Sequence, residues 1–274
     1  MIEFRSISFR YHEDWVLQDV SFRVERGEFL GVIGPNGSGK STLLKILYRF
    51  LAPQEGDIFF DLVPMRNMDR ADISKRIAVV AQETHILFPF TVLETVLMGR
   101  SPHMGNIMFE SQKDLEIARK AMEWTNIVPF SERPIDELSG GERKRVFIAR
   151  AVAQEPEVIL LDEPTANLDI HHQIDFLDLI LTLNRERGLT IVMASHDMNI
   201  ASEFCDRLIL LQGGRIYKMG TPDEVITKEN IETVYGCEVW IDQNPISGMP
   251  RVSVLRKGRS RRDGALEKDR SHTG

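Results

Sequence analysis

The sequence predicts an α/β fold: a parallel β-sheet covered by helices on both faces, with an antiparallel β region before it and a helical subdomain inserted in the chain. Strand-like apolar runs alternate with helical patterns in the second half of the chain, which favours a parallel sheet. Residues 157–164, EVILLDEP, are apolar without alternation, as in a central strand buried on both faces. From about residue 90 to 153 the patterns are helical instead, which indicates the inserted subdomain.

The N-terminal part is expected to hold short strands around a glycine-rich loop. Residues 2–9 alternate apolar and polar side chains, the pattern of a half-buried strand. Further strands are expected within residues 16–34, the last of them running into the loop. A helix is expected from Lys40 through residues 41–51, ended by a proline and a glycine. Two short β-like runs follow at residues 57–61 and 76–82.

In the middle region, residues 113–124 carry their apolar side chains at the spacing of one helix face. After EVILLDEP we expect a helix over 170–187 stopped by Gly188, then a strand, a helix and a strand up to residue 212, and a Gly-Gly turn. Residues 237–256 predict a β-hairpin around Pro-Ile-Ser-Gly. The expected domains are a main domain over 1–240 with a helical subdomain at about 88–152, a hairpin extension at 236–258, and a disordered polar tail at 259–274.

Composition limits the classes of function. The chain has 274 residues and a net charge of −7, whereas a nucleic-acid binder usually has a basic excess. Cys205 and Cys237 are expected to be reduced thiols of a cytosolic protein. No N-terminal targeting segment and no membrane-spanning apolar run are recognised, so we expect a membrane role only through a partner. Residues 256–270 carry seven Lys/Arg against three acids; such a run is usually solvated, and contact with anionic lipid is the alternative.

The glycine-rich loop carries the first chemical motif. GPNGSGKS fits the pattern G-x-x-x-x-G-K-[ST], between a predicted strand and a predicted helix. Small residues let consecutive backbone N–H groups surround phosphates, Lys40 reaches the β- and γ-phosphates, and the Ser41 hydroxyl binds Mg²⁺. The motif therefore predicts a nucleoside triphosphate site at Gly34, Pro35, Asn36, Gly37, Ser38, Gly39, Lys40, Ser41 and Thr42.

A phosphate loop also needs a carboxylate for the metal. EVILLDE ends in Asp162, which is placed to hold Mg²⁺ directly or through water, and in Glu163, which is suited to polarise a water for attack on the γ-phosphate. Two solvated acids at a strand end are the alternative interpretation. Together with the loop, the pair predicts Mg²⁺-dependent hydrolysis of a nucleoside triphosphate.

Residues 138–152, LSGGERKRVFIARAV, open a helix with Ser-Gly-Gly. Backbone N–H groups are free at a helix N-terminus, and the helix dipole favours negative charge there. This segment is therefore a second candidate phosphate cradle, although a plain helix N-cap is the alternative.

With these motifs the chain resembles the ATP-binding cassette (ABC) ATPases. GPNGSGKST, LSGGE, LLDEPTANLD and ASHD occur in the family's order, and the resemblance covers roughly residues 2–240. It implies that two copies pack head to tail, with each ATP between the phosphate loop of one copy and the Ser-Gly-Gly of the other. Ser139, Gly140 and Gly141 would then bind the γ-phosphate held by the other copy's Lys40, so the two cradles would serve one site.

The resemblance implies four further site residues. Gln82 would sense the γ-phosphate and Mg²⁺ and contact a membrane subunit, and His196 would hold the γ-phosphate and the attacking water. Asp169 would couple the two sites across the dimer, and Tyr11 would stack on adenine. The alternatives are a surface glutamine, a structural histidine and a core tyrosine.

Two departures from the family pattern remove no catalytic group: Glu142 where many members have glutamine, and Ala166-Asn167 where Ser-Ala is frequent. The other histidines fit no metal-ligand spacing and are expected at the surface: His12, His85, His103, His171 and His172.

Residues 88–105, 167–180 and 220–239 resemble the ATPase subunits of bacterial importers for iron-siderophores, haem and cobalamin. This implies two copies beneath a permease dimer at the cytoplasmic face of the inner membrane, fed by a substrate-binding protein. Residues 82–100 would form the groove for a permease helix. The motifs do not separate these cargoes from one another.

Other classes of ABC protein stay as alternatives. One is an importer of a metal ion, molybdate or phosphonate, and another is an ABC ATPase acting on DNA, ribosomes or cluster assembly. No long coiled coil interrupts the cassette and only one cassette is present, which disfavour the DNA-repair and translation types. A regulatory subunit is disfavoured because Lys40, Glu163 and His196 are all present.

Overall fold

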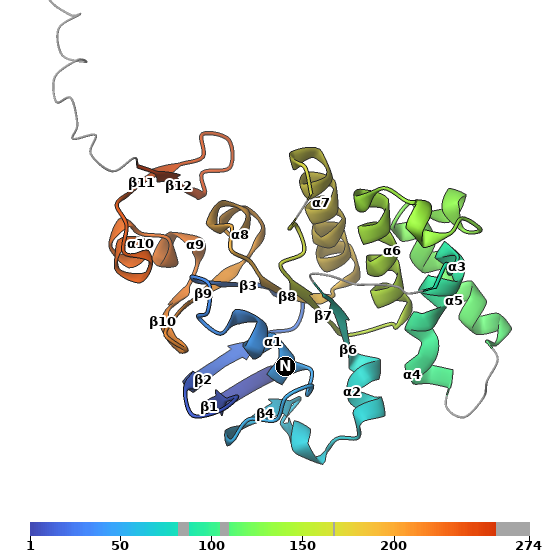
Figure 1. The fold of residues 1–274 in the computed structure, drawn as a ribbon, viewed down its shortest axis with the longest axis horizontal. Coiled ribbons are helices and arrows are strands. Elements are labelled where there is room, and N and C mark those ends of the chain that lie inside the picture. The colour runs from blue at the N-terminus through green and yellow to red at the C-terminus, as the bar shows by residue number, and fades with distance from the viewer. Residues whose placement is uncertain (82–87, 105–109, 167, 256–274) are drawn as a thin grey trace, which may run out of the picture.

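The computed structural model describes residues 1–81, 88–104, 110–166 and 168–255, and it contains two main β-sheets with helices packed between and beside them (Figure 1). Gln82, His85, Asn167 and the tail from residue 256 lie outside the described residues. None of the described helices is both long and apolar enough to cross a bilayer. Both cysteines are free, Cys205 buried and Cys237 exposed.

The N-terminal sheet is antiparallel throughout, as predicted. Its strand order is β2-β1-β4-β5, and each neighbouring pair runs antiparallel. Its strands are β1 (Ile2–Arg10), β2 (Trp15–Val24), β4 (Glu55–Phe60) and the short β5 (Val63–Pro64).

The central sheet has the order β10-β9-β3-β8-β7-β6, and its pairs are parallel except β10 with β9. The predicted parallel sheet is thus confirmed with one antiparallel edge strand added. That strand follows the Gly-Gly turn, where Gly213 and Gly214 have φ of 53° and 77°, values that glycine adopts without steric cost. The strands are β3 (Phe29–Ile33), β6 (Ile77–Val80), β7 (Val158–Asp162), β8 (Thr190–Ala194), β9 (Arg207–Gln212) and β10 (Arg215–Gly220).

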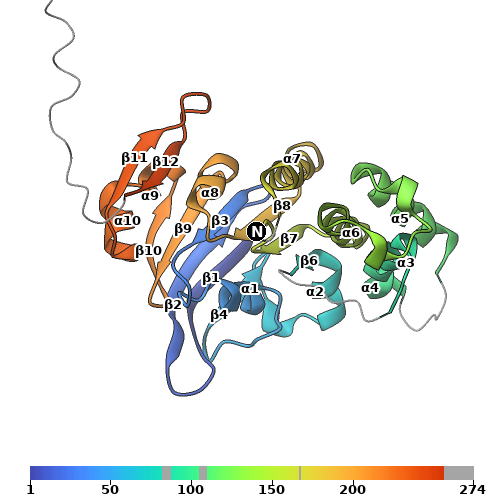
Figure 2. The ribbon, with the colours of Figure 1, turned by 45° about the horizontal axis from the view of Figure 1, so that its top comes forward.

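Each face of the central sheet has its own hydrophobic core. Along β7, Ile159 and Leu161 belong to one core, while Val158 and Leu160 belong to the other, because successive side chains of a strand point to opposite faces. The helix α1 (Lys40–Leu47) packs between the central and N-terminal sheets (Figure 2). On the opposite face lie α6 (Gly140–Ala153), α7 (Ile170–Arg187) and α8 (Met198–Phe204).

The helical region is confirmed as an insertion between β6 and β7. Within it, α3 and α5 pack against α6 (Figure 1). In α5 the side chains of Ala118, Ala121 and Met122 are buried, as the spacing predicted. Capping boxes begin α3, α5 and α6, each satisfying backbone N–H groups that the helix leaves unpaired. Besides α6, the region contains α3 (Val92–Leu97), α4 (Ser101–Met104) and α5 (Gln112–Trp124).

Several elements differ from the sequence expectation. The helix expected through residue 51 ends at Leu47, because Arg49 takes φ 55° and the N–H of Phe50 turns back to the carbonyl of Lys45 at 2.9 Å. The expected end of α7 at Gly188 is confirmed, with φ 65°. Three short helices were not expected: α2 (Arg70–Arg76), α9 (Pro222–Val225) and α10 (Lys228–Tyr235).

The expected C-terminal hairpin is present. Strands β11 (Val239–Gln243) and β12 (Pro250–Val254) pair antiparallel. The hairpin lies against α8 (Figure 1), where the Ser202 hydroxyl donates to the carbonyl of Pro250 at 2.7 Å.

Candidate active site

The glycine-rich loop runs from the end of β3 to the start of α1, so it lies at the carboxyl edge of the central sheet. At Gly39, φ is 103° and a Cβ atom would lie 2.6 Å from Leu17 Cδ2 and 2.9 Å from the Val16 carbonyl oxygen. At Gly34, φ is 150° and a Cβ would lie 2.5 Å from the Leu211 carbonyl oxygen. Only glycine fits at these two positions, so neighbouring backbone fixes the path of the loop.

Polar groups of the loop are oriented toward its interior. The buried Lys40 ammonium donates to the carbonyls of Gly34 at 2.8 Å and Pro35 at 3.1 Å. Burial lowers the pKa of Lys40, while the carboxylates of Glu163 and Asp162 act in the opposite direction. The Ser38 hydroxyl is buried and lacks a hydrogen-bond partner among the described residues. Such an orphaned donor beside a lysine fits the oxygens of a phosphate.

Ser41 and Asp162 come together from α1 and β7. The Ser41 hydroxyl donates to Asp162 Oδ1 at 2.9 Å. Burial raises the pKa of Asp162, and the hydrogen bond from Ser41 opposes this rise. A hydroxyl and a carboxylate beside a phosphate cradle are the oxygen ligands that Mg²⁺ takes together with phosphate oxygens. These two residues therefore fit the ion expected from the sequence.

Glu163 and His196 lie at the ends of the neighbouring strands β7 and β8. His196 Nδ1 is 3.7 Å from Glu163 Oε2. Glu163 has φ 47°, a left-handed conformation that costs a non-glycine residue about 1–3 kcal/mol. Its N–H donates to the carbonyl of Ala194 at 3.0 Å, which holds the strained backbone. The expected carboxylate and imidazole thus meet at the edge of the sheet that carries the phosphate loop.

Tyr11 lies beside the start of α1. Its ring is 50% exposed and meets Phe9 edge-on, with centroids 4.9 Å apart. Its hydroxyl is 3.4 Å from the Thr42 hydroxyl. The alternative of a core tyrosine is wrong, because a half-exposed ring next to the phosphate loop is open to a flat ligand.

Ser139 and Gly140 are exposed at the N-terminus of α6. Ser139 caps the helix: its hydroxyl accepts from Glu142 N–H at 3.3 Å, and Glu142 Oε2 accepts from Ser139 N–H at 2.8 Å. Hydrogen bonds from the Ser139 side chain and backbone N–H to the carboxylate lower the pKa of Glu142. Ser139 therefore does act as a helix N-cap, and Glu142, where many family members have glutamine, completes the capping box. The helices α6 and α1 pack on opposite faces of the central sheet, so the two cradles stand on separate helices of one chain.

Asp169 caps α7, and its carboxylate bonds to His172. His172 was expected at the surface, and its side chain is 39% exposed there, but the imidazole also lies between Asp169 and Gly141. Its position three residues after a helix N-cap was the signal available in the sequence. Three other histidines are exposed as expected: His12, His103 and His171. Gln82 is not among the described residues, so its predicted role is not addressed by the geometry.

The comparisons of this chain with known proteins all find ABC transporter proteins. The family model described as ABC transporter matches residues 17–166. The ferric enterobactin transport ATP-binding protein of Escherichia coli (strain K12) is 39% identical over 89% of this chain and 90% of its own. A petrobactin import ATP-binding protein of Bacillus anthracis is 37% identical over 94% of each chain. The cobalamin import ATP-binding protein of Halobacterium salinarum (strain R1) is 38% identical over 88% of this chain and 60% of its own.

Solved structures share the fold. A metal-chelate type ABC transporter in an inward-facing conformation matches with a TM-score of 0.83 and 30% identity, over 93% of this chain and 97% of the other. A dimeric ATP-binding cassette in a post-hydrolysis state, bound to ADP and Pi, matches with a TM-score of 0.69 and 30% identity, over 81% of this chain and 98% of the other.

Proposed function

This chain belongs to the ABC transporter family, and from that membership we propose that it is the ATP-hydrolysing subunit of an importer for a metal chelate such as an iron-siderophore, haem or cobalamin. The Ser41–Asp162 hydrogen bond beside the Glu163–His196 pair is the observation that carries the catalytic part. The cargo class rests on relatives whose names specify siderophore and cobalamin import.

Each site residue has a role in this proposal. Lys40 and the N–H groups of the loop bind the β- and γ-phosphates of ATP. Ser41 and Asp162 would hold Mg²⁺, with Gln82 as a further ligand, and a bound ion would supply positive charge to neutralise the phosphate oxygens. Glu163 accepts a proton from the attacking water, a type of catalysis that contributes about 10²- to 10⁴-fold. His196 donates to the γ-phosphate and orients that water.

A second copy of the chain completes the site. Ser139, Gly140 and Gly141 of one copy bind the γ-phosphate held by Lys40 of the other. The exposure of Ser139 and Gly140 at the N-terminus of α6 supports this arrangement, because a helix N-terminus open to a neighbour can take the phosphate that the other copy holds. A relative of known structure is a dimeric ATP-binding cassette.

The permease is proposed to dock between the nucleotide-binding half and the helical region. There α2 contacts α4, and a groove is lined by Tyr48, Ser74, Met98 and Pro102. This groove includes part of the stretch 82–100 that the sequence assigned to a permease helix. It would hold the subunit at the cytoplasmic face of the membrane.

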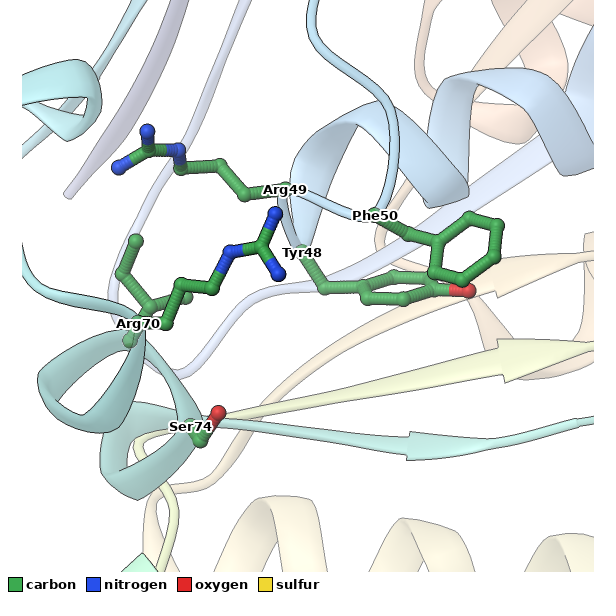
Figure 3. A pocket seen from close by; sticks show the side chains of 6 residues that line it. Tyr48, Arg49, Phe50, Arg70 and Ser74 are labelled. Carbon is green, nitrogen blue, oxygen red and sulfur yellow. The ribbon is translucent and has the colours of Figure 1, made fainter.

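A neighbouring pocket extends this surface (Figure 3). Arg49 and Arg70 border it together with Tyr48, Phe50 and Ser74. Phe50 is 69% exposed, and the Arg70 guanidinium suits an acidic side chain, while that of Arg49 donates to the carbonyls of Met65 and Met68. The pocket therefore offers an aromatic and cationic surface to a membrane partner.

The proposal is tested by tagging the chain in its native cell, solubilising the membranes gently and identifying what co-purifies. A polytopic membrane protein in equal amount is expected. Phe50→Ser is expected to lose that protein while ATP binding of the purified chain is kept, because Phe50 lies outside the nucleotide site. Ile246→Ser is the matched control, since Ile246 is 95% exposed on the distant hairpin.

Recovery of the chain only with soluble proteins, ribosomes or DNA would contradict the importer role while leaving the ATPase chemistry intact. With the permease identified, uptake of a radiolabelled ferric siderophore is then compared with uptake of cobalamin, molybdate and free metal ions in cells that lack this chain. Loss of molybdate or free-ion uptake alone would replace the metal-chelate cargo by that alternative.

A further inference from the structure

We propose that His172 is a positioning residue that ties Asp169 to the Ser139–Gly141 segment of the same chain, so that both parts of the interface with the second copy are held as one unit. The inference rests on the proposed function, which assigns Ser139, Gly140 and Gly141 to the γ-phosphate held by the other copy, and on the coupling role across the dimer that the family resemblance implies for Asp169. It concerns a side chain to which neither the motifs nor the proposed function assigns a role.

The first half of the tie is a set of hydrogen bonds to Asp169. His172 Nδ1 lies 2.8 Å from Asp169 Oδ1 and 2.9 Å from Oδ2, and the His172 backbone N–H donates to Oδ1 at 2.9 Å. Because a carboxylate only accepts, Nδ1 carries the proton in this contact. The hydrogen bonds from His172 also lower the pKa of Asp169. The carboxylate is therefore fixed in one orientation at the N-terminus of α7.

The second half of the tie is packing against Gly141. A Cβ atom at Gly141 would lie 2.1 Å from His172 Cδ2 and 2.9 Å from both Cγ and Nε2. The imidazole therefore lies directly on the Gly141 backbone, and no side chain fits between them. Gly140, by contrast, has open space where its Cβ would be. One ring thus contacts the Asp169 carboxylate on one edge and the buried glycine on the other.

A neighbouring lysine joins the same two segments. Lys144 on α6 donates to the carbonyl of Pro164 and, at 2.9 Å, to that of Ala166. Gln173 on α7 donates to the carbonyl of Leu168 at 3.0 Å. The described part of the chain between β7 and α7 is thus bonded to both helices that flank it.

These contacts give a physical route between the two halves of the ATP site. The segment that follows Glu163 reaches Asp169, His172 joins Asp169 to Gly141, and Gly141 begins α6. Because packed groups with defined hydrogen bonds shift together, movement of Ser139 with the partner's nucleotide would be carried to the end of β7. The phosphate loop joins β3 to α1 and takes no part in these contacts, so binding of ATP to a single chain does not depend on this tie.

The test measures ATPase kinetics of the full chain with four substitutions. His172→Ala and His172→Phe are expected to lower kcat by about tenfold, since a hydrogen bond to a charged group is lost, and to leave KM for ATP unchanged. His172→Asn is expected to recover most of kcat, because its amide can donate to Asp169. His103→Ala is the matched control, since His103 is exposed on α4 and takes no part in these contacts.

Two results would overturn the inference. One is a kcat of His172→Ala equal to that of His103→Ala. The other is a fall in kcat accompanied by equal falls in ATP affinity and melting temperature, which would mark a purely structural role. A failure of the proposed ATP site looks different, because the unsubstituted chain would then not hydrolyse ATP, whereas a failure of the importer role leaves hydrolysis intact. An active wild-type chain with an equally active His172→Ala variant therefore removes this inference alone.

Discussion

Replacement of Glu163 by glutamine is expected to lower ATP turnover by about 10²- to 10⁴-fold, the usual contribution of a general base, while ATP still binds. Glutamine keeps the size of the side chain but cannot accept the proton of the attacking water. The strained backbone at φ 47° and the bond to the Ala194 carbonyl are unaffected by the change. Steady-state phosphate release and equilibrium binding of a fluorescent ATP analogue measure the two quantities separately.

Glu186→Gln is the control for this experiment, because Glu186 is an exposed glutamate on α7 outside the site. A Glu163→Gln variant that turns over ATP at the wild-type rate would remove Glu163 from the role of general base. Loss of ATP binding in the same variant would point instead to a disturbed phosphate loop.

Lys40→Met is expected to weaken ATP binding by about 10- to 100-fold, since charge-assisted hydrogen bonds to the phosphates are lost, and to abolish hydrolysis with it. Methionine keeps the apolar part of the buried side chain. Burial lowers the pKa of Lys40, so its charged form is disfavoured in the folded chain, and removing that charge relieves this cost. We therefore expect Lys40→Met to lose ATP affinity without a matching fall in the melting temperature measured in the absence of nucleotide.

Isothermal titration with ATP in the presence of Mg²⁺ measures this effect, and Lys75→Met on α2 is the control because Lys75 pairs only weakly, at 3.9 Å, with Asp72. Unchanged affinity of Lys40→Met would contradict the assignment of the phosphate loop as the ATP cradle. A large fall in melting temperature would show that the loss of affinity reflects unfolding.

The sequence predicted those parts of the fold that local chemistry determines. Gly188 ends α7 because it takes a left-handed conformation without steric cost, and the apolar run at β7 indicated a central strand. The predicted end of α1 was wrong because Arg49 takes positive φ, and arginine is not a residue type that indicates a turn. The helix α2 was missed because it buries only Ile73, so no apolar periodicity marks it.

The site was predictable where motifs sit at the ends of parallel strands. Ser41 and Asp162 are 121 positions apart in sequence, yet a glycine loop after one strand and an acid at the end of another must meet at the same edge of a parallel sheet. His172 was not predictable in this way. Its contact with Gly141 depends on how α6 packs beside α7, which no local pattern in the sequence specifies.

The central claim is that each ATP lies between the phosphate loop of one copy and the Ser-Gly-Gly of another. In a background of Cys237→Ser and Glu163→Gln, which removes the exposed thiol and blocks turnover, chains with Asn36→Cys are mixed with chains with Ser139→Cys. Both substituted positions are exposed. Mild oxidation should give a disulfide-linked dimer with ATP and Mg²⁺ and none without nucleotide, whereas the same yield of dimer with and without ATP, or no dimer at all, would contradict the two-chain site.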